Sequence, residues 1–86
     1  MKLPRDLTGK DLVRALKPLG YLPTRQVGSH TRLTTFERGE HHVTVPEHGP
    51  LRVGTLEVII SMVAGHFAMG HEELVERLFG AESSGR

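Results

Sequence analysis

Gly28, Ser29 and His30 form a tripeptide whose residue types could do chemistry near neutral pH. Histidine is the only side chain whose ordinary pKa, about 6.5, lets it take up and release protons in that range. Glycine permits a backbone conformation that a Cβ hinders, and serine adds a hydroxyl and a backbone N–H that can face an anion. The same residues also suit an ordinary turn that ends in a solvent-facing histidine. The tripeptide alone therefore leaves both interpretations open.

Two arginines flank the tripeptide and could bind phosphate. Arg25 lies five residues before His30, and Arg32 lies two residues after it, on the same face of any regular strand that runs through both. A guanidinium can hold a phosphate through two parallel hydrogen bonds. We therefore expect a phosphate-binding group that contains Arg25, Arg32 and the Gly28–Ser29 bend. Surface arginines are common, so each could equally be a solvated side chain.

The other histidines do not form a metal-binding pattern. His41 and His42 are adjacent, so in a strand they point to opposite faces and cannot both line one site. His66 and His71 lie beside glycines and are expected at helix ends or in solvent. No pair has the spacing of H-E-x-x-H, and the chain has no cysteine. We expect no metal and no cofactor.

The tripeptide is positioned by predicted strands. The first should cover residues 21–27, with Pro23 favouring an edge, and the second residues 33–36. A turn over residues 38–40 should lead to a third over residues 41–45, in which Val43 and Val45 face the core and His42 and Thr44 face the other way. Aromatic Phe36 is expected in the core, as is Phe79.

Helical patterns lie on both sides of these strands. Thr8 and Asp11 resemble a capping pair and begin a helix over residues 8–18, whose end is disturbed by Pro18. Thr55 is the expected N-cap of a second helix that reaches Gly65, and a third segment covers about residues 70–79. The order predicts an α+β fold: a three-stranded antiparallel sheet with helices packed on one face.

Length and charge limit the chain to a few classes. The 86 residues predict a single domain over residues 1–86, with an ordered core at about 8–79 and a frayed tail at 81–86. Without cysteine or a long apolar stretch, we expect a cytoplasmic protein with no membrane partner. Residues 1–40 carry eight Lys/Arg against four Asp/Glu, and residues 41–86 carry three against six. The basic half suits a polyanion, although it is equally compatible with plain solvated surface.

Three motifs, in order and at fitting spacing, resemble those of the HicA family of small bacterial toxins. The resemblance covers about residues 8–79, and three motifs in order are much more specific than any one of them. The motifs are Gly20-Tyr21 leading through Arg25-Gln26 to Gly28-Ser29-His30, then Val45-Pro46-Glu47-His48, and finally Gly54-Thr55-Leu56 with Ile59.

The resemblance implies a fold like the double-stranded-RNA-binding domain and an mRNA interferase activity without a metal. It implies that His30 is the catalytic histidine, and it makes Gly28, Ser29, Arg25, Arg32 and His48 candidates for RNA contacts. It also implies an RNA substrate and a HicB-type antitoxin that inhibits the toxin, which alone is expected to be a monomer.

Two other function classes remain open at this point. The first is a non-catalytic RNA-binding module in which His30 contacts phosphate or a 2′-hydroxyl, because a fold does not by itself specify an activity. The second is an interaction domain whose exposed sheet edge recruits a protein. Turnover of RNA would indicate a ribonuclease and not a non-catalytic RNA-binding module. Absence of RNA binding at low salt would favour the protein-interaction domain.

Overall fold

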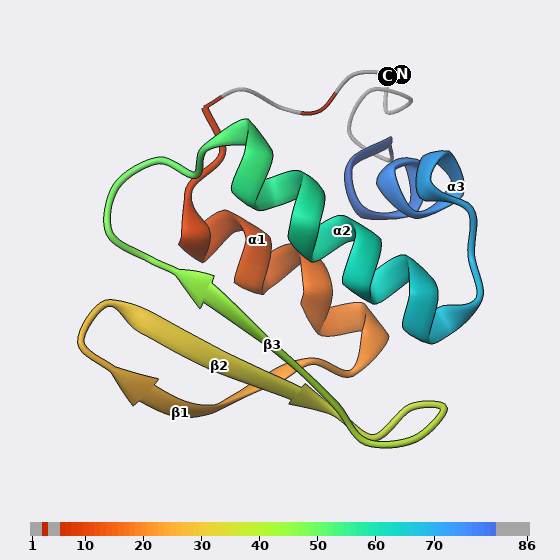
Figure 1. Cartoon of the computed structure of the whole chain (residues 1–86), viewed down its shortest axis with the longest axis horizontal. Coiled ribbons are helices and arrows are strands. Elements are labelled where there is room, and N and C mark those ends of the chain that lie inside the picture. The colour runs from red at the N-terminus through yellow and green to blue at the C-terminus, as the bar shows by residue number, and fades with distance from the viewer. Residues whose placement is uncertain (1–2, 4–5, 81–86) are drawn as a thin grey trace.

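The computed structural model describes Leu3 and residues 6–80. Helices and strands follow the order α-β-β-β-α, with a further helical segment at the end, and the three strands form one antiparallel sheet in the order β1-β2-β3. Figure 1 shows α1 and α2 lying on the same side of this sheet. The predicted α+β architecture is confirmed and is consistent with a fold like the double-stranded-RNA-binding domain. The expected tail at 81–86 lies outside the described residues.

Helix α1 (Gly9–Leu16) begins with the predicted capping box. The Thr8 hydroxyl accepts a hydrogen bond from the Asp11 backbone N–H, and the Asp11 carboxylate accepts one from the Thr8 N–H, each at 3.1 Å. The helix ends earlier than residue 18, because Pro18 lies in a 3₁₀ turn (Lys17–Leu19). Gly20 closes that turn in the left-handed region, with φ of 90°.

The sheet consists of β1 (Leu22–Val27), β2 (His30–Thr35) and β3 (His41–Pro46). Strand β2 is central, and β1 is an edge strand with an irregularity between Pro23 and Arg25, in line with the expected effect of the proline. Strand β2 begins three residues earlier than the sequence pattern predicted, at His30 instead of Leu33. It begins directly at His30 because the preceding turn contains only two residues.

Helix α2 (Val53–Phe67) is longer than predicted at both ends. Its N-cap is Arg52, which makes no capping hydrogen bond with its side chain, so the expected N-cap at Thr55 is wrong and Thr55 lies in the first turn. Burial rather than capping explains this helix, because six of its residues are buried. They are Leu56, Ile59, Ile60, Val63, Ala64 and Phe67.

The last segment consists of α3 (His71–Val75) and a π-helical turn (Glu76–Gly80). Leu74 and Val75 are buried, and Phe79 packs partly buried against the core, as predicted. The expectation for Phe36 is wrong, since its side chain is 72% exposed. Its neighbour Thr35 is fully buried on the inner face, so alternation directs Phe36 to the opposite face.

The core lies between the helices and the inner face of the sheet. Leu33, Val43 and Val45 supply the sheet side, as predicted for the two valines, and Leu12 and Leu16 supply the α1 side. Because strand side chains alternate, the residues between these inner positions are directed to the face that no described helix covers. We call this the open face.

Candidate active site on the open face of the sheet

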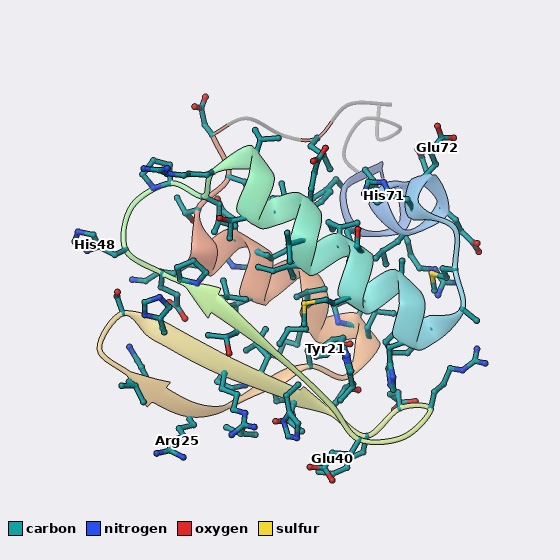
Figure 2. All side chains as sticks on the ribbon, in the orientation of Figure 1. Tyr21, Arg25, Glu40, His48, His71 and Glu72 are labelled. Carbon is teal, nitrogen blue, oxygen red and sulfur yellow. The ribbon has the colours of Figure 1, made fainter. Side chains whose placement is uncertain are left out.

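The open face carries a shallow concavity of about 340 Å³ that is lined by three of the predicted site residues, His30, Arg25 and Arg32. Figure 2 shows the Arg25 side chain directed away from the helices, on the opposite side of the sheet from Tyr21. All three strands contribute side chains to the lining. These are Arg25, Val27, His30, Arg32, His42 and Thr44.

The turn before His30 is a two-residue hairpin connection. Val27 pairs with His30 across β1 and β2, so only Gly28 and Ser29 lie between the strands. Gly28 has φ of 59°, while Ser29 keeps a negative φ, and this combination requires glycine at the first turn position. The chain therefore reverses tightly and delivers His30 as the first residue of β2.

The His30 side chain is exposed, and its ring makes no hydrogen bond to any part of the chain that the structure describes. Both ring nitrogens are accessible to a bound molecule. An imidazole in this situation can accept a proton on one nitrogen or donate one from the other. This is the arrangement needed of an acid or base that acts on an external substrate.

Backbone contacts hold the corner of the fold in which His30 lies. His30 pairs with Pro46 at the end of β3, and the Glu47 N–H donates to the Ser29 carbonyl at 2.6 Å. A Cβ at Gly9 would collide with the Pro46 carbonyl oxygen, so the start of α1 packs closely on the same strand end. The turn, the end of β3 and the start of α1 therefore fix one another.

Arg25 and Arg32 are direct cross-strand partners in the β1–β2 ladder. Both side chains are exposed, and neither forms an ion pair among residues 6–80. Like charges placed directly opposite each other destabilise a sheet unless an anion lies between them. The pair is therefore suited to bind a phosphate beside His30.

His42 is the second histidine in the concavity, and both of its ring nitrogens are engaged. Nδ1 lies 2.7 Å from the Thr34 hydroxyl, and Nε2 lies 2.8 Å from the Glu40 carboxylate. The Thr34 hydroxyl also lies 2.8 Å from that of Thr24. In contrast to His30, this ring is held in a fixed orientation.

The structure thus brings His30, Arg25 and Arg32 together, with Gly28 and Ser29 in the adjoining turn. His48 lies apart from them: it is exposed in the loop after β3 and does not line the concavity, and Figure 2 shows it pointing into solvent. The sequence reasoning left His42 and Thr44 out of the site. The signal that could have found them is the alternation of β3, which already placed both opposite Val43 and Val45.

His41, the neighbour of His42, lies on the core side of the sheet, as the alternation predicted. Its Nδ1 lies 2.8 Å from the Tyr21 hydroxyl, and its ring stacks on His66 with ring centroids 4.3 Å apart. Burial lowers the pKa of His41, and charge on His66 and then on His42 lowers it further. Burial also raises the pKa of Tyr21 to about 12, so its hydroxyl stays protonated.

Two further properties of the described residues bear on function. They contain no group of three or more His, Cys, Asp or Glu side chains arranged to hold a metal ion. They also contain no single helix long and apolar enough to cross a membrane; by length and composition only α2 and the final helical segment together, bent by 105°, would pass such a test.

Comparison with protein families gives a match to the model of the HicA toxin of bacterial toxin–antitoxin systems. The match covers residues 9–63, which is 55 of 86 residues and includes the sheet, the Gly28–Ser29 turn and most of α2. Comparison with curated proteins gave no match, and comparison with solved structures gave none. The family model covers more than half of the chain, and the chain therefore belongs to the HicA family of toxins of toxin–antitoxin systems.

Proposed function

We propose that this toxin is a metal-independent endoribonuclease that cleaves RNA at the open face with His30 as its proton-transferring residue. The observation that carries the proposal is the placement of an exposed, unengaged imidazole beside the opposed pair Arg25 and Arg32. Membership of the HicA family supports the choice of RNA as the polyanion. A cytoplasmic location, where mRNA is available, is part of the same proposal.

The reaction uses the 2′-hydroxyl of the substrate as its nucleophile. His30 removes the 2′-hydroxyl proton, the 2′ oxygen forms a bond to the adjacent phosphorus, and the bond from phosphorus to the 5′ oxygen breaks. The leaving 5′ oxygen takes a proton from water or from the His30 imidazolium. The products are a 2′,3′-cyclic phosphate and a 5′-hydroxyl, so atoms and protons balance without any other reactant.

Arg25 and Arg32 stabilise the negative charge that builds up on the phosphoryl oxygens. Guanidinium groups are always charged and match the geometry of a phosphate. The β1–β2 pairing places the two arginines side by side next to His30, so both guanidinium groups can reach the same phosphate. The backbone N–H groups of Gly28 and Ser29 lie in the adjoining turn and offer further donors for the same phosphate.

The test is cleavage of a long single-stranded RNA by the purified protein in the presence of EDTA. Wild type and His71→Ala should cut equally, since His71 lies on α3, and His30→Ala should not cut. Equal cutting by the His30 variant would place the activity elsewhere. Products ending in a 5′-phosphate would contradict attack by the 2′-hydroxyl, and binding without turnover by the wild type would make this an RNA-binding module.

An inhibitory protein partner follows from the family. We propose a HicB-type antitoxin that covers the open face, where Val27 leaves 63% of its side chain exposed beside the charged residues. Adding such an antitoxin should stop cleavage in a stoichiometric manner. It should also slow hydrogen exchange in β1, and unchanged exchange there during full inhibition would place the antitoxin on another surface.

A further inference from the structure

The polar row of β2 continues along the open face beyond the proposed site. His30, Arg32 and Thr34 occupy alternate positions of one regular strand, which places them about 6.7 Å apart along it. Thr34 pairs with His42 on β3, so the row ends in a second imidazole. This repeat is close to the distance between successive phosphates in an extended single-stranded nucleic acid.

The two partners of His42 differ in character. Thr34 is only 5% exposed and is fixed between Thr24 and His42, so it is the inner, permanent partner. Glu40 belongs to the turn between β2 and β3, its side chain is 60% exposed, and it approaches His42 from the solvent side. Figure 2 shows Glu40 at the outer edge of the sheet, on the side away from the helices. Its contact is therefore the one that an arriving molecule can replace.

Glu40 also provides an anion at a surface that otherwise offers cations. Within the part of the chain that the structure describes, no carboxylate lines the concavity, whose charged and titratable groups are Arg25, Arg32, His30 and His42. A carboxylate oxygen that accepts a hydrogen bond from an imidazole N–H makes the same contact that a phosphate oxygen would make. The Glu40 carboxylate thus occupies the position that the next phosphate along the row would take, beyond the phosphate at Arg25 and Arg32.

We propose that His42 is a phosphate subsite two outward positions beyond His30, and that Glu40 occupies it in the free protein as an internal substitute for phosphate until RNA displaces it. This inference rests on the proposed function for the nature of the ligand. It adds a binding subsite to that function. It also means that Glu40 lowers the affinity of the free protein for RNA. RNA long enough to extend from His30 to His42 must displace Glu40, which lowers its binding affinity. A dinucleotide at His30 does not reach Glu40, so its affinity is unaffected.

The test compares binding of an eight-nucleotide single-stranded RNA and a dinucleotide in the His30→Ala background, which keeps the RNA intact. Glu40→Gln should bind the octamer about two- to fivefold more tightly, as expected for loss of one exposed contact to a carboxylate, and should bind the dinucleotide as before. Glu72→Gln, an exposed acid on α3, is the matched control for the change in net charge.

Adding His42→Ala should weaken octamer binding and abolish the gain from Glu40→Gln. The inference is overturned if Glu40→Gln behaves as Glu72→Gln does, if its gain survives loss of His42, or if no RNA binds at low salt. Should the double variant fail to fold, the comparison of the two glutamates decides alone. Cleavage by the wild type is measured separately, so a protein that binds as described but does not cut would remove the proposed enzyme activity and leave the subsite.

Discussion

Arg25 faces Arg32 across the β1–β2 ladder on the open face, and no described carboxylate neutralises either of them. Two positive charges directly opposite each other in a sheet are destabilising. The arrangement becomes favourable only when an anion lies between the two guanidinium groups. The pair thus links the stability of the fold to the occupancy of the proposed site.

Replacing either arginine should therefore stabilise the fold and weaken the proposed function. Arg25→Gln or Arg32→Gln should raise the free energy of unfolding by a few tenths of a kcal/mol, because the repulsion is relieved. The same variants should cleave RNA more slowly and lower the slope of log affinity against log salt by about 0.7 for each lost phosphate contact. Chemical denaturation and RNA binding at several salt concentrations measure the two effects. Arg77→Gln serves as the control, and a variant with an unchanged salt slope would remove that arginine from the site.

Thr31 offers a stabilising substitution within β2. Its hydroxyl is buried, with the residue 3% exposed, and it has no hydrogen-bond partner among the described residues. Thr31→Val keeps the shape and removes the unsatisfied group, so the free energy of unfolding should rise by about 1 kcal/mol. The neighbouring Thr35→Val is the contrasting control, because the Thr35 hydroxyl donates to the Leu19 carbonyl at 2.9 Å and should be costly to lose. Thermal unfolding of both variants checks the prediction, which a destabilised Thr31→Val would contradict.

Stability should depend on pH through His41. Its pKa is lowered by burial and by charge on His66 and His42, so the unfolded chain binds more protons than the folded chain below the ordinary value of 6.5. The melting temperature should fall as the pH drops from 7 toward 5, once the unfolded state begins to take up this proton. His66→Gln removes one facing charge and should flatten the dependence, whereas His71→Gln should not. If the melting temperature depended equally on pH in the wild type, His66→Gln and His71→Gln, the His41–His66 pair would not control this pH dependence.

Phe36 should contribute to RNA binding and not to stability. Its side chain is 72% exposed, and alternation along β2 directs it away from the side on which Thr35 is buried. An exposed aromatic ring at the end of the proposed row of phosphate contacts can stack on a base. Phe36→Ala should leave the melting temperature nearly unchanged and weaken binding of single-stranded RNA several-fold, while Phe36→Tyr should bind as the wild type does. Undiminished binding by the alanine variant would exclude stacking at this position.

Local patterns were enough to predict the turn and the faces of β3. A bend at Gly28-Ser29 was expected, although it was expected to include His30, and alternation alone separated Val43 from His42. The start of α2 could not be read locally, because the helix extends to Val53 without a side-chain cap and owes its stability to burial. The His41–His66 stack joins residues 25 positions apart, and no local pattern indicates which ring a histidine will meet. Phe36 was misplaced because its aromatic side chain was taken as a core residue, whereas alternation from the buried Leu33 and Thr35 places it on the other face.

The contacts that join the turn, the end of β3 and the start of α1 have a consequence for synthesis of the protein. His30 is made early, but its strand partner Pro46 and the Glu47 N–H that holds Ser29 emerge from the ribosome later. The packing of α2 over the sheet requires still later residues. We therefore expect a nascent chain to lack the finished corner, and with it the proposed site, until residues of β3 and α2 have been translated.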